Sequence, residues 1–274
     1  MQNFYNSPGF TGETDVFSIG KTWLGRDITC LRSGLGKKKV LLVGGIRAGD
    51  GAITELLKKT VDIFSGQGRN QGIPGLNIPK LFSSVRLYVI PELNPDGRHM
   101  RLSGVGDGNP LAARCRRMNG GSDDFSAWQS NARGVDLMHN FDGGWLDARK
   151  LGNAAPGISG YAGEYPESER ESLSLRLFSA SVRPDIVCVL SSGPDTVLSV
   201  FPGSKKARLT AGCMGVSVSD MYSRKDLYAE YGAGSFCAWS EASEKVFSPM
   251  ILFSDASEHV PGKIQNLLLC CALV

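Results

Sequence analysis

The hydrophobic positions of the chain fall into short continuous runs that alternate with longer amphipathic stretches. A short apolar run bounded by Gly or Pro is typical of a strand buried in a sheet, and apolar positions three and four residues apart are typical of a helix. Buried strands are predicted over Lys39–Val43, Val85–Ile90, Asp185–Ser191 and Met250–Ser254. Strands nearer a sheet edge are predicted over Asp27–Arg32 and Thr196–Phe201.

The amphipathic stretches predict helices over Ala52–Phe64, Pro166–Ser181, Ala207–Tyr222 and Gly262–Cys271. The segment Arg98–Gly160 has little periodicity and predicts a long loop, a kind of segment that is more often functional than not. It follows Asn94–Gly97, whose Pro and Gly suit a type I turn. No internal repeat divides the chain. We therefore expect an α/β fold in a single domain over residues 1–274, with a central mixed, mostly parallel sheet flanked by helices.

Composition narrows the classes of protein. Hydrophobic residues make up 42% and charged residues 21%, and 30 Lys and Arg stand against 27 Asp and Glu, which argues against disorder and against nucleic-acid binding. No apolar run approaches the roughly 20 residues of a membrane-spanning helix. Met1–Gly20 lacks the basic start and apolar stretch of a secretion signal, so we expect a cytoplasmic protein that contacts no membrane. Seven cysteines without a CxxC pair favour reduced thiols.

In an open α/β sheet a ligand binds beyond the carboxyl ends of the strands. Four segments of this chain follow predicted strands and are the places to expect chemistry. They are Arg47–Asp50, Asn94–Gly97, Leu190–Asp195 and Ser254–Glu258.

Several short motifs, taken together, resemble a known family. They are Gly44-Gly-Ile-Arg-Ala48, Asn94-Pro-Asp-Gly97, Asn131-Ala-Arg-Gly-Val-Asp-Leu137, Asn140-Phe-Asp142 with Trp145, and Tyr165-Pro-Glu-Ser-Glu169. Their order and spacing are those of zinc carboxypeptidases, and the sequence is most similar to the bacterial branch that acts on cell-wall peptides of the gamma-D-glutamyl-diaminopimelate type. The resemblance covers nearly the whole chain, and it implies a zinc-carboxypeptidase-like (phosphorylase/hydrolase-like) fold.

The same resemblance implies that the zinc site is lost. The family holds zinc with a His and a Glu three residues apart and a second His on a later strand, which leaves one position open for water. In this sequence the first His corresponds to Arg47, whose guanidinium cannot act as a ligand. The Glu corresponds to Asp50, and the second His to Leu190 or, one residue further, Ser191. The catalytic Glu corresponds to Ser254, which has no useful basicity. We therefore expect no zinc and no catalytic residue.

The substrate-binding positions of the family also differ here. Met138 and His139 stand where the family has the Asn and Arg that grip a terminal carboxylate, and Gln129 lies near the position of a basic residue that polarises the scissile carbonyl. A neutral amide donates a weaker hydrogen bond there.

We therefore expect a catalytically inactive protein whose crevice binds a peptide, a small anion or a partner protein. The predicted lining is Arg47, Asp50, Gln129, Met138, His139, Leu190, Ser191 and Ser254. Within it, Arg47 forms a local salt bridge with Asp50 or binds an anion.

Two alternatives stay open. One is a working metallocarboxypeptidase with a non-standard metal site, made of Asp50, His139 and a second carboxylate such as Asp142 or Asp255. The other is a purely structural or interaction protein whose working surface lies elsewhere. Fold resemblance alone does not decide between them, because function belongs to the site.

Overall fold

The computed structural model describes residues 11–67, 76–106, 108 and 111–274. Within these residues one eight-stranded sheet has the order β1-β2-β4-β3-β5-β8-β6-β7. The strands are β1 (Thr14–Lys21), β2 (Asp27–Ser33), β3 (Lys38–Val43), β4 (Val85–Ile90), β5 (Ile186–Ser192), β6 (Thr196–Ser199), β7 (Ser217–Asp220) and β8 (Met250–Phe253). Four of the seven pairings are parallel, and those of β1 with β2, β2 with β4 and β6 with β8 are antiparallel.

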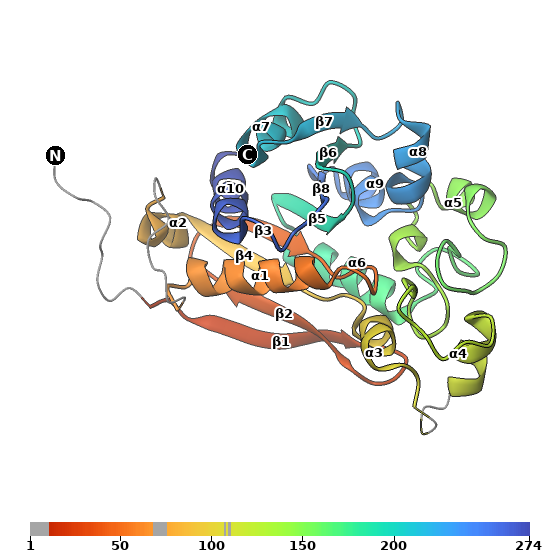
Figure 1. The fold of residues 1–274 in the computed structure, drawn as a ribbon. Helices are drawn as coiled ribbons and strands as arrows, with labels where there is room; N and C mark the ends of the chain where they lie inside the picture. Colours follow the sequence, from red (N-terminus) through yellow and green to blue (C-terminus); the bar gives the residue numbers. More distant parts are fainter. Residues whose placement is uncertain (1–10, 68–75, 107, 109–110) are drawn as a thin grey trace.

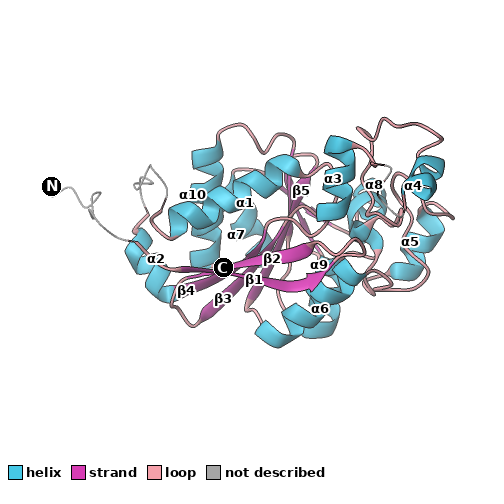
Figure 2. Cartoon of the chain, turned by 90° about the horizontal axis from the view of Figure 1, so that it is seen from below, coloured by secondary structure: helices cyan, strands magenta, loops and turns pink. Residues whose placement is uncertain are grey.

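Helices cover both faces of this sheet (Figure 2). One face carries α1 (Gly51–Phe64), α2 (Ile78–Ser84), α7 (Lys205–Met214) and α10 (Val260–Leu273). The other face carries α6 (Arg170–Val182) and α9 (Phe236–Trp239). Residues of β3 alternate between the two cores, with Leu42 on the first and Leu41 on the second. A strand covered on both faces reads as a continuous apolar run, which is why the central strands are visible in the sequence.

The short helices gather at one end of the sheet (Figure 1). They are α3 (Pro95–Ser103), α4 (Ala112–Met118), α5 (Trp145–Leu151) and α8 (Lys225–Leu227). A 3-10 turn, η1 (Leu137–His139), and two π-helical turns, η2 (Tyr228–Gly232) and η3 (Ser240–Glu244), complete the set of elements. Two of these short helices, α4 and α5, lie within the segment predicted as a long loop, and α3 begins before it and ends inside it.

The predicted strands are confirmed to within two residues, but β1 is missed. None of its residues is fully buried and Val16 is 66% exposed, so this edge strand has no apolar run to reveal it. The helix predicted over Ala207–Tyr222 is too long. It ends at Met214 because Gly215 takes a left-handed conformation with φ of 67°, and the chain then forms β7.

Two other boundaries also differ from the prediction. The helix predicted from Pro166 begins only at Arg170. The segment Asn94–Gly97 begins a helix, because the Asn94 side chain accepts a hydrogen bond from the backbone N–H of Gly97 and caps α3. The first ten residues, half of the segment searched for a secretion signal, lie outside the described residues. Among the helices in the described part of the chain, none is long and apolar enough to cross a membrane.

Candidate functional site

The loop after β3 brings Arg47 and Asp50 to the ends of the central strands. Gly45 has a φ of +58°, and a Cβ there would lie 2.7 Å from the Cα of Glu92, so the loop requires glycine at this position. The backbone N–H of Asn94 donates to the Gly45 carbonyl at 2.9 Å. The loop is thereby held against the neighbouring strand end, and α1 begins directly after Asp50.

Asp50 is buried, and each of its carboxylate oxygens accepts hydrogen bonds. The Ser191 hydroxyl lies 3.0 Å from Oδ2 and 3.1 Å from Oδ1, and the backbone N–H of Ser192 donates to Oδ1 at 3.0 Å. The backbone N–H of Arg47 donates to Oδ2 at 3.2 Å. Burial raises the pKa of Asp50 above its ordinary value, although these donors and the Arg47 charge oppose the rise.

The structure places Ser191, and not Leu190, at this site. Successive residues of a strand point to opposite faces, so only one of the two can face Asp50. Leu190 lies in the core beneath α1 and α10, on the face away from Asp50. Ser191 therefore stands at the position that the sequence left open between them.

The Arg47 side chain is 11% exposed and lies among acidic groups. Its Nη1 donates to Oε1 of Glu230 at 2.5 Å, and Nη2 donates to the backbone carbonyl of Glu230 at 2.8 Å. Nη2 lies 3.5 Å from Oδ2 of Asp136, and the guanidinium carbon lies 5.3 Å from the ring centre of Tyr231. Burial alone would lower the pKa of Arg47, but Asp136, Glu230 and Asp50 outweigh it and raise that pKa.

The prediction that the Arg47 side chain forms a salt bridge with Asp50 is wrong, because the guanidinium pairs with other carboxylates. In the described part of the chain, the carboxylates within 4 Å of the guanidinium are those of Asp136 and Glu230. Asp50 instead accepts from the backbone of Arg47. We call the group formed by Arg47, Asp50, Asp136, His139, Ser191 and Glu230 the Arg47 site.

His139 and Asp136 form the inner wall of this site. The Nδ1 of His139 lies 2.7 Å from the Ala233 carbonyl, which can only accept, so this nitrogen carries the hydrogen. The other nitrogen, Nε2, lies 3.5 Å from Nη2 of Arg47 and 4.0 Å from Oδ2 of Asp136. Burial would raise the pKa of Asp136, but the charge of Arg47 and the backbone N–H donors of Gly160 and Met138 act against burial, and that pKa is lowered.

The other predicted lining residues have different surroundings. Gln129 accepts a hydrogen bond from the backbone N–H of Gly49 at 3.0 Å, beside the Arg47 site. Met138 is buried in the apolar core beneath α6. Ser254 is exposed, and its backbone N–H and hydroxyl donate to the Asp195 carboxylate at 3.0 and 2.6 Å. Ser254 is thus bonded to the carboxylate of Asp195 rather than to Arg47 or Asp50.

Sequence reasoning missed three members of the surroundings of Arg47. Asp136 lies inside one of the quoted motifs, so its position was available as a signal, but nothing in the motif points to an ion pair. Glu230 and Tyr231 lie in η2, 183 and 184 residues after Arg47 in the chain. No spacing rule connects residues that far apart, and only the fold brings them together.

The side chains at the three positions of the family's zinc ligands do not fit a zinc ion. Arg47 has no lone pair to donate and carries a positive charge. Both oxygens of Asp50 already accept hydrogen bonds, and Ser191 supplies a neutral hydroxyl that points at this carboxylate. The arrangement is a buried cation held by carboxylates.

The alternative metal site made of Asp50, His139 and a further carboxylate is not assembled. Of the residues that the structure describes, no group of three or more His, Cys, Asp or Glu side chains is placed to hold a metal ion. Asp255 accepts hydrogen bonds from Ser257, and Asp142 is exposed.

A family model described as zinc carboxypeptidase matches residues 10–231 of the chain. The gamma-D-glutamyl-L-diamino acid endopeptidase 1 of Lysinibacillus sphaericus is 27% identical over 158 residues, which are 57% of this chain and 40% of that protein. The uncharacterized protein YqgT of Bacillus subtilis (strain 168) is 28% identical over 188 residues, which are 68% of this chain and 50% of that protein. The chain thus spans half or less of the length of these curated relatives.

Solved structures match over nearly the whole chain. The murein-tripeptide amidase MpaA from Escherichia coli O157 is similar with a TM-score of 0.62 and 18% identity, covering 95% of this chain and 93% of that one. The thrombin activatable fibrinolysis inhibitor is similar with a TM-score of 0.70 and 16% identity, covering 96% of this chain and 70% of that one. At these identities the similarity concerns the fold, and it confirms the expected carboxypeptidase-like α/β architecture.

Proposed function

The chain belongs to the zinc carboxypeptidase family, and from that premise we propose that it is a non-catalytic member, which binds peptides at its strand ends but neither holds zinc nor hydrolyses them. One observation carries this proposal. The guanidinium of Arg47, at the position of the first zinc ligand, is buried and paired with Asp136 and Glu230. A second cation beside it would be repelled, because charges a few ångströms apart in a buried site interact strongly.

The absence of a general base supports the same proposal. The family's catalytic Glu corresponds to Ser254, whose hydroxyl donates to Asp195. A serine hydroxyl has no useful basicity near neutral pH, so it would not activate water for attack on a peptide. The carboxylate of Asp50, on the same loop as Arg47, already accepts hydrogen bonds from N–H and O–H donors on both of its oxygens.

The chemistry of the relatives suggests the ligand. One relative is named for gamma-D-glutamyl-L-diamino acids and one solved structure for murein tripeptide. A gamma-linked glutamyl residue keeps its own α-carboxylate free, so a dipeptide of this kind presents two carboxylates, one on each residue. We take a gamma-D-glutamyl dipeptide as the ligand class to test, since a guanidinium is the side chain best suited to hold a carboxylate.

The test uses gamma-D-glutamyl-L-lysine and the purified chain with added zinc. Calorimetry measures binding, and chromatography measures release of free lysine. We expect binding with no release of lysine above that of a protein-free blank. Zinc-dependent release that a chelator abolishes would overturn the non-catalytic assignment, and a lack of binding by the wild-type chain and by Glu230→Gln would overturn the binding role.

A further inference from the structure

We propose that the Glu230 side chain occupies the place of a ligand carboxylate on Arg47, so that a peptide binds through a carboxylate that displaces the Glu230 side chain. This inference rests on the proposed binding function and names how the site recognises and admits its ligand. The side chain of Glu230 then acts as a built-in competitor, and the affinity of the site is set by how readily this carboxylate leaves.

The two carboxylates on Arg47 are not equivalent. The Asp136 side chain is fully buried, and it also accepts backbone hydrogen bonds from Met138 and Gly160. The Glu230 side chain is 56% exposed, and its carboxylate is bonded to Arg47. A ligand that arrives from solvent therefore meets Glu230 first, while Asp136 stays in place.

Exchange of one carboxylate for another leaves the charge of the site unchanged. Arg47 is buried and positively charged, so removal of Glu230 without replacement leaves it with less compensation. A ligand carboxylate restores that compensation, whereas a neutral ligand of the same shape does not. The site therefore selects for a carboxylate, although its other groups, Asp50 and Asp136, are themselves acidic.

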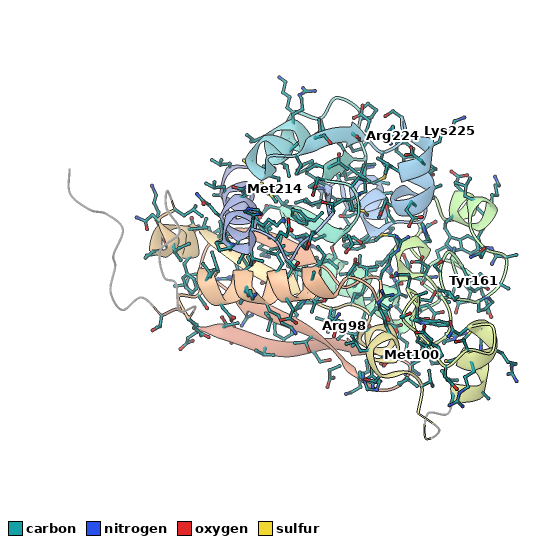
Figure 3. All side chains as sticks on the ribbon, viewed as in Figure 1. Arg98, Met100, Tyr161, Met214, Arg224 and Lys225 are labelled. Atoms are coloured by element: carbon teal, nitrogen blue, oxygen red, sulfur yellow. The ribbon has the colours of Figure 1, made fainter. Side chains whose placement is uncertain are left out.

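The segment that carries Glu230 is held so that the Glu230 side chain can move away from Arg47 while the backbone of the turn stays in place. Glu230 lies in the π-helical turn η2, which follows α8, a helix of three residues whose start is marked by Arg224 and Lys225 in Figure 3. The turn is held on both sides of Glu230. The hydroxyl of Tyr228 donates to Asp147 at 2.8 Å, and that of Tyr231 donates to the Ser192 carbonyl at 3.1 Å.

The bond of Tyr231 to the Ser192 carbonyl also holds its ring against Arg47, with the guanidinium carbon 5.3 Å from the ring centre. A rotation of the Glu230 side chain into solvent thus leaves the backbone of the turn and the stacked Tyr231 in position. Single π-helical turns are rare in proteins as a whole, and those that occur often lie at functional sites.

The experiment compares the wild-type chain with Glu230→Gln. Glutamine keeps the size of the side chain but removes its charge, so it competes less well for Arg47. The probe is gamma-D-glutamyl-L-lysine, measured by calorimetry, and the control ligand is the same dipeptide with both carboxylates converted to carboxamides. Glu258→Gln, at an exposed glutamate after β8, is the matched control variant. Glu230→Ala is the second variant, and circular dichroism checks that each variant is folded.

We expect Glu230→Gln to bind the dipeptide about tenfold more tightly than the wild-type chain, which corresponds to about 1.4 kcal/mol. The carboxamide ligand shows no such gain, and Glu258→Gln binds as the wild type does. Equal or weaker binding by both Glu230 variants, with binding by the wild type intact, overturns this inference and leaves the proposed function standing. Binding by the Glu230 variants alone supports the inference, and hydrolysis by the wild type defeats the proposed function instead.

Discussion

Asp50 and Ser191 are joined side chain to side chain across the ends of β3 and β5, with the Ser191 hydroxyl 3.0 Å from Oδ2 of Asp50. The resemblance aligns these two residues with zinc ligands of the family, and in this chain their side chains bond to each other. The hydrogen bonds to Asp50 thereby link the two strand ends.

Asp50→Ala is therefore expected to destabilise the fold. It leaves the Ser191 hydroxyl and the backbone N–H groups of Arg47 and Ser192 without their acceptor, which costs about 2–4 kcal/mol of unfolding free energy. Urea unfolding monitored by circular dichroism measures this cost. Asp62→Ala, at an exposed aspartate of α1, is the control and should change stability by no more than about 0.5 kcal/mol. Equal small losses in both variants would show that the Asp50 bonds contribute little.

The pair of Arg47 and Asp136 gives a second prediction. Arg47→Met removes the charge that compensates buried Asp136, so the unfolding free energy should fall by about 3–5 kcal/mol. Adding Asp136→Asn should recover part of this loss, with a coupling of about 1–3 kcal/mol in a double-mutant cycle.

The control for this prediction is the exposed ion pair of Arg32 on β2 with Asp15 on β1, in which the nitrogen and oxygen lie 2.8 Å apart. Arg32→Met should cost less than about 1 kcal/mol, because exposed pairs are screened by solvent. A coupling near zero between Arg47 and Asp136 would contradict the view that the guanidinium compensates this carboxylate.

Glu171 gives a prediction about pH. Burial raises the pKa of Glu171 from its ordinary 4.5 to about 8, and the neighbouring charges of Glu169 and Asp96 add to the rise. Between these two pH values the folded protein keeps a proton that the unfolded chain has released. The stability contributed by this group is complete below pH 4.5 and is lost as the pH rises to about 8, by up to about 1.4 kcal/mol per pH unit.

Glu171→Gln removes this dependence, so the variant should gain on the wild type as the pH rises. The difference in unfolding free energy between the two should grow by about 2–4 kcal/mol from pH 5 to pH 8 in urea titrations. A difference that stays constant over this range would show that Glu171 does not take up a proton on folding. Glu258→Gln is expected to show no pH-dependent difference.

The cap of α3 gives a fourth prediction. Asn94 accepts from Gly97 and donates to the Ser130 carbonyl, so Asn94→Ala should lower stability by about 1–2 kcal/mol. Asn94→Asp keeps the acceptor but loses the donor, and an intermediate loss is expected in thermal unfolding. If the two variants lose equally, the capping bond is not what holds this turn.

Much of the fold is visible in the sequence, for physical reasons. Strands β3, β4, β5 and β8 are covered on both faces by helices and therefore appear as apolar runs. The edge strand β1 has no such cover and no such run. The prediction of a helix through Gly215 was wrong because the periodic spacing of apolar residues continues past the point where the backbone turns. Only the left-handed conformation of Gly215 marks the end of the helix.

Only the part of the site that follows the buried strands could be predicted from the sequence. Arg47 and Asp50 follow a buried strand, so their position at the strand ends could be inferred, and Ser191 was one of two candidates on β5. The carboxylates that hold Arg47 could not be inferred. Asp136 and Glu230 lie in segments without periodicity, and an ion pair leaves no pattern in a single sequence. The sequence predicted a local ion pair of Arg47 with Asp50, but the guanidinium pairs with these two residues, which are more distant in the chain.

Whether Arg47 excludes the metal is tested by the zinc content of the untagged chain after dialysis against micromolar zinc, determined by elemental analysis. The variant Arg47→His with Asp50→Glu and Ser191→His restores the family's donors and serves as the positive control. We predict close to no zinc in the wild-type chain and a rise toward about one zinc ion per chain in the triple variant. A content of about one zinc ion per wild-type chain would contradict it, because Arg47 would then not exclude the metal.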